Sequence, residues 1–239
     1  MSSHTPTSAS PVVVFDAVGT LIYPAPSAAD VYARYGREYG SQMTVDEIAV
    51  RFSNAFHQQE QADQLDKLRR RNTTEQRERE RWRTIVTDVF EEVPHASNEL
   101  FDDLWEHFSQ GRHWQVFGDV VETWQTLQKQ GYLLAIASNF DDRLPQICQE
   151  HHPLNSCRHI FWSAEIGYPK PSPEFFARVT ARLKVPSNQI FFVGDSLVND
   201  FQGAHAAGWN VKLLTRGETS LSQDHRITSL CEVVPWVAG

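Results

Sequence analysis

The feature that most constrains the fold is an alternation of short apolar segments with helical segments over the second half of the chain. Four apolar segments follow residue 116, and each is long enough for a strand. They read YLLAIASN at 132–139, HIFWSAEI at 159–166, IFFVGD at 190–195 and NVKLL at 210–214. Helical segments are expected at 119–130, 141–150, 172–184 and 198–207. Strands that alternate with single helices connect in parallel with right-handed crossovers, so we expect a doubly wound parallel sheet.

A further buried strand is expected far upstream, at residues 11–22, which open with PVVVFD. The segment 25–111 that follows it is charge-rich and contains no convincing strand. Its apolar residues recur at helical spacing, as in residues 45–56, 82–90 and 100–108, which favours helix cores over a ligand-binding stripe. The expected architecture is therefore α/β: a Rossmann-like core of 11–24 and 112–239, interrupted by an all-helical insertion at 25–111.

The first residues of the chain and its cysteines indicate the cellular compartment of the protein. Residues 1–10 have no basic start and no apolar stretch, so they predict a disordered leader and not a signal peptide. No apolar run reaches the ~18 residues that a membrane span needs. The three cysteines, Cys148, Cys157 and Cys231, show no CxxC spacing and predict buried free thiols in a reducing cytosol. We expect a cytoplasmic protein with no membrane partner.

The charge of the chain limits its partners. The formal net charge is −8, which argues against nucleic acid or an anionic membrane as the main partner. An anionic small-molecule substrate would then need local positive charge from a metal, lysine or arginine. The charged run RRRNTTEQRERERWR at 69–83 predicts a solvated helix face, and a second interpretation places some of its arginines over the active site. The oligomeric state stays open.

Polar residues follow several of the expected strands. Asp16 follows VVVF, Ser138 and Asn139 end the strand at 132–139, and Asp195 ends the strand at 190–195. Lys170 stands just before the helix at 172–184. Each residue alone is an ordinary turn, cap or surface residue. Because the carboxyl ends of parallel strands meet at one edge of a sheet, where ligands bind, together they predict a site.

The chemistry that these residues suit is attack by a carboxylate on an electrophile, often phosphorus. A carboxylate and a phosphate repel each other unless a cation offsets their charge. Mg²⁺ held by Asp16 and Asp195 would do so. Lys170 would hold the nucleophile and the transferring group, while Thr20 and Ser138 would donate hydrogen bonds to its oxygens.

In this order the residues resemble the haloacid dehalogenase (HAD) superfamily. The motifs are D-x-x-G-T-L at 16–21, Ser138, Lys170-Pro171 and G-D-S-x-x-N-D at 194–200, and the resemblance covers residues 11–215. The helical insertion resembles the C1 cap of that superfamily. The segments SNFDDRL, GYPKPSPEFF and GDSLVNDFQGAHAAG are similar to the branch called haloacid-dehalogenase-like hydrolase domain-containing protein three.

The resemblance implies two groups of site residues and Mg²⁺ as the cofactor. The metal ligands would be Asp16, the carbonyl of Val18 and Asp195, and Asp200 would be either a further ligand or an acid behind the ligands. The phosphoryl group would be bound by Thr20, Ser138, Asn139 and Lys170. Asp16 would be the catalytic nucleophile and Lys170 its catalytic partner, acting on a small phosphorylated substrate.

Val18 departs from the phosphatases of the superfamily, which carry a second aspartate at this position as general acid and base. Such a group is typically worth ~10²–10⁴-fold in rate, so a phosphatase built this way should be slow unless a residue of the cap supplies the acid. The sequence FDAVGTL resembles instead the 2-haloacid dehalogenases, which need no metal, whereas Asp195 and Asp200 favour one. A metal-free dehalogenase-like hydrolase and a catalytically quiet binding protein are the alternatives. GDSL at 194–197 also matches a serine esterase motif, with Ser196 as nucleophile, but its late position disfavours that interpretation.

Overall fold

The core of the molecule is a parallel sheet of six strands in the order β5-β4-β1-β6-β7-β8. The computed structural model describes residues 11–65, 72–93, 97–216 and 223–239. The strands are β1 (Val12–Phe15), β4 (Leu133–Ser138), β5 (Ile160–Trp162), β6 (Ile190–Gly194), β7 (Asn210–Leu214) and β8 (Arg226–Ile227). The predicted doubly wound α/β fold is therefore confirmed. The predicted leader at 1–10 lies outside the described residues.

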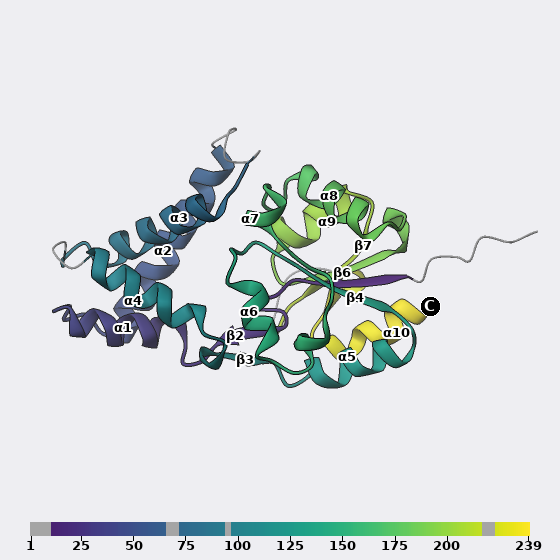
Figure 1. Cartoon of the computed structure of the whole chain (residues 1–239), viewed down its shortest axis with the longest axis horizontal. Helices are drawn as coiled ribbons and strands as arrows, with labels where there is room; N and C mark the ends of the chain where they lie inside the picture. Colours follow the sequence, from purple (N-terminus) through teal and green to yellow (C-terminus); the bar gives the residue numbers. More distant parts are fainter. Residues whose placement is uncertain (1–10, 66–71, 94–96, 217–222) are drawn as a thin grey trace, which may run out of the picture.

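Helices cover both faces of the sheet (Figure 1). One face carries α5 (Val120–Lys129), α6 (Leu144–Gln149) and α10 (Val233–Ala238). The other carries α7 (Ser163–Ile166), α8 (Pro173–Leu183) and α9 (Gly203–Ala206). The central strand β1 supplies both cores, because Val13 and Phe15 join the first while Val12 and Val14 join the second. This burial on both faces explains the unbroken apolar run of β1.

The predicted strand at 11–22 is wrong in its extent, because the extended backbone stops at Phe15. Leu21 N–H donates to the Ala17 carbonyl, which folds residues 16–21 into a turn. Gly19 allows the turn because its φ is +85°. The chain then enters a small antiparallel sheet of β2 (Ile22–Pro24) and β3 (Trp114–Val116), which the sequence pattern did not predict.

Two other predicted elements differ from the structure. The apolar segment 159–166 is extended only in β5, and the remainder forms α7, which ends at Gly167 with a left-handed φ of 83°. The predicted helix at 198–207 begins with a π-helical segment, Leu197–Gln202, before α9. The two-residue strand β8 was too short for its pattern to be recognised.

The insertion consists of α1 (Ala28–Glu38), α2 (Val45–Leu65), α3 (Glu75–Val89) and α4 (Ser97–Ser109). Between residues 25 and 111, the described part of the chain contains no strand, as predicted. These helices have an apolar core of their own, in which Ile48, Ile85 and Leu100 are fully buried. They lie beside the carboxyl edge of the main sheet, joined to it through β2 and β3 (Figure 1).

The charged run at 69–83 is less solvated than predicted. The guanidinium groups of Arg79, Arg81 and Arg83 lie over aromatic rings of the insertion, and Arg83 is 4.5 Å from the Phe101 ring centre. Arg79 also pairs with Asp102, and Arg81 pairs with Asp63. These three arginines therefore stabilise the insertion and do not lie free over the active site. Residues 69–71 of the run lie outside the described residues.

The cysteine prediction holds for two of the three thiols. All three cysteines are free, and Cys148 and Cys157 are buried, but Cys231 is exposed. Cys231 stands in the short helical turn Leu230–Glu232, whose buried side is occupied by Leu230. None of the helices in the described part of the chain is both long and apolar enough to span a bilayer.

Candidate active site

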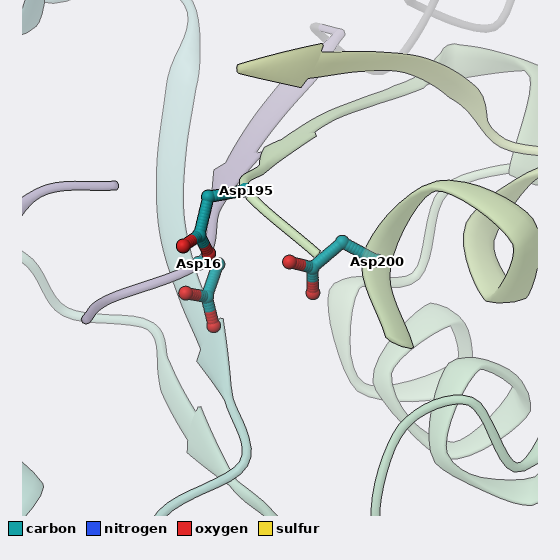
Figure 2. A group of neighbouring side chains, drawn as sticks. All are labelled: Asp16, Asp195 and Asp200. Atoms are coloured by element: carbon teal, nitrogen blue, oxygen red, sulfur yellow. The ribbon is translucent and has the colours of Figure 1, made fainter. Parts of the chain in front are cut away.

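Three aspartates meet at the carboxyl edge of the sheet (Figure 2). Asp16 follows β1 and Asp195 follows the neighbouring β6, while Asp200 comes from the π-helical segment after β6. Each offers a carboxylate oxygen, and these oxygens all lie within 4.8 Å of one another. Asp16 and Asp200 are buried, whereas Asp195 retains access to solvent. The structure thus brings together the three acidic residues that the sequence singled out.

Lys170 joins two of these carboxylates. Its Nζ donates to Asp16 Oδ1 at 2.7 Å, to Asp200 Oδ1 at 2.5 Å and to the Ala137 carbonyl at 3.1 Å, so all three of its protons are engaged. Burial alone would lower the pKa of Lys170, but the two carboxylates outweigh it and raise the pKa above its ordinary value. The ammonium group therefore stays charged, and its predicted contact with a phosphoryl group would require one of these bonds to be exchanged.

Ser138 and Asn139 both end β4 but serve different partners. Ser138 Oγ donates to Asp16 Oδ1 at 2.8 Å. The Asn139 amide instead binds the backbone of Lys170, donating to its carbonyl at 2.9 Å and accepting from its N–H at 2.7 Å. In this structure Asn139 therefore positions Lys170, while its predicted phosphate contact would need its amide to be released.

Asp195 and Asp200 resist ionisation when the site holds no cation. Although Asp195 keeps contact with solvent, partial burial of its carboxylate, followed by the charges of Asp16 and Asp200, raises its pKa to about 7. Burial likewise raises the pKa of Asp200 to about 6, despite the opposing effect of Lys170. The Ser196 N–H donates to Asp200 Oδ2 at 2.9 Å, so the latter carboxylate is held at both oxygens.

The turn after Asp16 contains the other predicted residues. Val18 packs its side chain against the apolar core, and only its carbonyl could serve a metal. Thr20 is fully buried, and its Oγ1 finds no hydrogen-bond partner in the described structure. Gly194, at the end of β6, leaves room for the Asp200 side chain, because a Cβ at position 194 would lie 2.4 Å from the Asp200 carboxylate.

The donor set fits a hard divalent cation. With all three carboxylates ionised, the site carries a summed charge of −2 after the Lys170 ammonium group is counted, and Mg²⁺ would offset this charge. Carboxylate oxygens, a backbone carbonyl and open access to water are the ligands that Mg²⁺ prefers. Burial, followed by the neighbouring carboxylates, raises the pKa of Asp195, and a bound cation would favour its ionised form.

Several contacts attach the insertion next to the site, and the sequence predicted no role for the residues that make them. Glu75, at the start of α3, accepts a hydrogen bond from the Asp142 N–H at 2.9 Å. On the other side of the site, Asn199 donates to Glu60 of α2 at 3.2 Å. Arg143 pairs with the buried Asp141 at 2.6 Å, and its guanidinium stacks 3.6 Å from the centre of the Trp105 ring in α4. The charged run in SNFDDRL was the available signal for Asp141 and Arg143.

Comparison with known proteins identifies the family of this arrangement. A family model described as haloacid dehalogenase-like hydrolase matches residues 11–208. The chain belongs to this hydrolase family. It is 29% identical to the mouse haloacid dehalogenase-like hydrolase domain-containing protein 3 over 237 residues, covering 94% of this chain and 92% of the mouse protein. The resemblance to the HAD superfamily and to this branch is therefore confirmed.

Solved structures of HAD hydrolases have the same fold but different named activities. A dehalogenase solved with an intermediate complex superposes with a TM-score of 0.69 at 20% identity, over 97% of this chain and 99% of that one. A HAD phosphatase from Thermococcus onnurineus superposes with a TM-score of 0.65 at 22% identity, over 96% and 98% of the two chains. At these identities the comparisons support the fold of the hydrolase, and the reaction must be argued from the site.

Proposed function

We propose that the chain is a Mg²⁺-dependent phosphatase or phosphotransferase that forms an aspartyl-phosphate on Asp16, and that Val18 makes it slow. The gathering of Asp16, Asp195 and Asp200 around Lys170 is the observation that carries the proposal. A site with a summed charge of −2 repels an anionic substrate unless a cation is present. A phosphate monoester is such a substrate, so the charge of the site favours metal dependence of its hydrolysis.

Asp16 is held in a suitable state for attack. Both Ser138 and Lys170 donate to its Oδ1, and within the described residues no hydrogen bond ends on Oδ2. Oδ2 would therefore form the new bond to phosphorus, while the bond from phosphorus to the leaving oxygen breaks. Water would then attack the same phosphorus, releasing inorganic phosphate and restoring the Asp16 carboxylate.

Mg²⁺ and the Lys170 ammonium group would offset negative charge during this reaction. Mg²⁺ bound by Asp16, Asp195, Asp200 and the Val18 carbonyl would offset the charge of the phosphoryl oxygens. The Lys170 ammonium group would offset the charges of Asp16 and Asp200 and would hold the nucleophile in its orientation. We also propose that Ser138, Asn139 and the turn at Thr20 bind the oxygens of the phosphoryl group.

Val18 leaves the leaving group without a proton donor at the position used by the phosphatases of this superfamily. Its side chain packs against the apolar core and cannot exchange protons. The departing oxygen must then carry its own negative charge, which aryl and acyl leaving groups tolerate and alkyl leaving groups do not. The proposed substrates are therefore small phosphorylated molecules, of which activated phosphates should react fastest.

Halide release separates this proposal from the second candidate. Val18 also suits carbon–halogen hydrolysis, because halide leaves without a proton. We expect aryl phosphate hydrolysis that requires Mg²⁺ and is lost in Asp16→Asn, with no halide released from short 2-halocarboxylates in EDTA. Metal-free halide release that disappears in Asp16→Asn would replace the phosphatase assignment by the dehalogenase one. No turnover and no phosphoenzyme would favour a binding role.

We also infer a cytoplasmic location, since the free thiols of Cys148 and Cys157 suit a reducing compartment. Expression with a fluorescent tag and fractionation of the host cell would test this. Recovery of the protein in a membrane or secreted fraction would contradict it.

A further inference from the structure

Arg216 reaches from the end of one strand to the turn that carries the nucleophile. It stands two residues after β7, and its Nη2 donates to the Thr20 carbonyl at 3.0 Å. Within the described residues, Arg216 is the one hydrogen-bond donor to this carbonyl. The two residues are 196 positions apart in the sequence, and none of the motifs at 16–21, 138, 170–171 and 194–200 includes Arg216.

The guanidinium group of Arg216 is itself fixed from two sides. Its Nη1 and Nη2 donate to the two oxygens of Asp119 at 3.1 and 3.0 Å, in a bidentate pair. Its Cζ lies 3.8 Å from the centre of the Phe117 ring, in a cation–π contact. The planar fork of arginine is required to pair with Asp119 and to reach Thr20 at once.

Asp119 is anchored in turn by the C-terminal segment. It accepts hydrogen bonds from Ser229 Oγ at 3.0 Å and from the Leu230 N–H at 2.9 Å. Burial would raise the pKa of Asp119, but the bonds from Arg216 and Leu230 lower it, so the carboxylate stays ionised. Arg216 is thus held by a charged group that cannot easily move.

The turn held by Arg216 sets two features of the proposed metal site. Thr20 is separated from the Val18 carbonyl by Gly19 alone, and Gly19 lies directly against the Asp195 carboxylate. The N–H groups of Leu21 and Ile22 both donate to the Ala17 carbonyl and make the turn a tight unit, so a shift of Thr20 moves its neighbours as well. A buried carbonyl that loses its hydrogen-bond donor is destabilised, so the turn should shift until the carbonyl finds another partner.

We propose that Arg216, held by Asp119, is a positioning residue for the metal site, acting through the Thr20 carbonyl. This inference rests on the proposed function, because it assumes that Mg²⁺ binds at Asp16 and Asp195. Outer partners that orient metal ligands typically change metal affinity by ~10–100-fold when they are removed. A role limited to stability would lower the unfolding temperature without changing metal affinity.

The test is a calorimetric titration of Mg²⁺ into the wild type, Arg216→Ala, Arg216→Lys and Arg182→Ala. Arg182 is the control, because it forms an exposed ion pair with Glu165 away from the site. We expect Arg216→Ala to bind Mg²⁺ ~10–100-fold more weakly, Arg216→Lys to lie between it and the wild type, and Arg182→Ala to match the wild type.

Each other outcome has a defined meaning. Wild-type Mg²⁺ affinity in folded Arg216→Ala would overturn the inference, even if its unfolding temperature fell. If Arg216→Ala does not fold, Arg216→Lys decides in the same way. Absence of binding by the wild type would instead overturn the proposed function, and the inference with it.

Discussion

Gly19 lies so close to Asp195 that a side chain at position 19 would occupy the place of the carboxylate. A Cβ built on Gly19 would lie 2.2 Å from Asp195 Oδ2, and the backbone there has a φ of +85°. The glycine of the first motif therefore does two things, since it turns the chain after Asp16 and admits the aspartate from the neighbouring strand. The two carboxylates can face a common cation because of this contact.

Gly19→Ala should destabilise the protein and weaken Mg²⁺ binding together, because the new methyl group would displace Asp195. Gly131→Ala is the matched control, since Gly131 has a φ of +86° but nothing within 4 Å of its Cβ position. The control should lose only the ~1–2 kcal/mol that a left-handed backbone costs other residues. Urea unfolding and calorimetry measure both effects. Equal losses in the two variants, with unchanged Mg²⁺ affinity in Gly19→Ala, would contradict this account.

Asp195→Asn should act in opposite directions on metal binding and on the stability of the metal-free protein. Removing one of three crowded charges relieves repulsion, so the free energy of unfolding in EDTA should rise. Mg²⁺ affinity should fall by at least about tenfold, because a carboxylate ligand is lost. Asp102→Asn, which breaks an exposed pair with Arg79, is the control. A fall in metal-free stability would argue against electrostatic crowding at the site.

The stability of the metal-free protein should fall as pH rises from about 4 to about 7. The pKa of Asp195 is raised from 3.8 to about 7 by burial and neighbouring charges, and that of Asp200 to about 6. In this range the folded state keeps protons that the unfolded state has lost, so raising the pH favours unfolding. Mg²⁺ requires the ionised carboxylates, so its affinity should rise over the same range. Urea unfolding in EDTA at pH 5 and 8 checks the first part, and stability that rises with pH would disprove it.

Lys170→Met should destabilise the protein, because it leaves the buried Asp16 and Asp200 without their shared cation. Breaking a buried ion pair from one side typically costs ~3–5 kcal/mol. Mg²⁺ should recover part of the loss, since it would offset the same charges. The free energy of unfolding with and without Mg²⁺ measures this, with the exposed Lys129→Met as control. A variant as stable as the wild type in EDTA would show that the lysine is not needed to balance the carboxylates.

Much of the core could be predicted from the sequence because its signals are local. Apolar runs separated by helices fix the parallel sheet, and parallel strands bring Asp16, Ser138 and Asp195 to one edge. The end of β1 was placed too late, because Ala17 and Val18 continue the apolar run inside a turn. Neither β3 nor β8 has enough residues for an alternating pattern to be recognised.

The parts of the site that escaped prediction depend on contacts between distant segments. Arg216 meets Thr20 only after β1, β6 and β7 have paired, and nothing near residue 216 indicates it. The role of Asn139 was also beyond the sequence, since its position after Ser138 does not reveal that its amide binds the Lys170 backbone. The exposure of Cys231 follows from the direction of a short helical turn, which composition does not specify.

Val18 gives the most direct test of the central claim, that Asp16 forms a phosphoenzyme without an adjacent proton donor. The measurement is steady-state turnover of an alkyl and an aryl phosphate, with Mg²⁺, by the wild type and Val18→Asp. The wild type should hydrolyse the aryl phosphate slowly after a burst and the alkyl phosphate hardly at all. Val18→Asp should raise alkyl phosphate turnover, by up to ~10²–10⁴-fold. Equal wild-type rates on both substrates, or no reaction and no phosphoenzyme with either protein, would contradict the account.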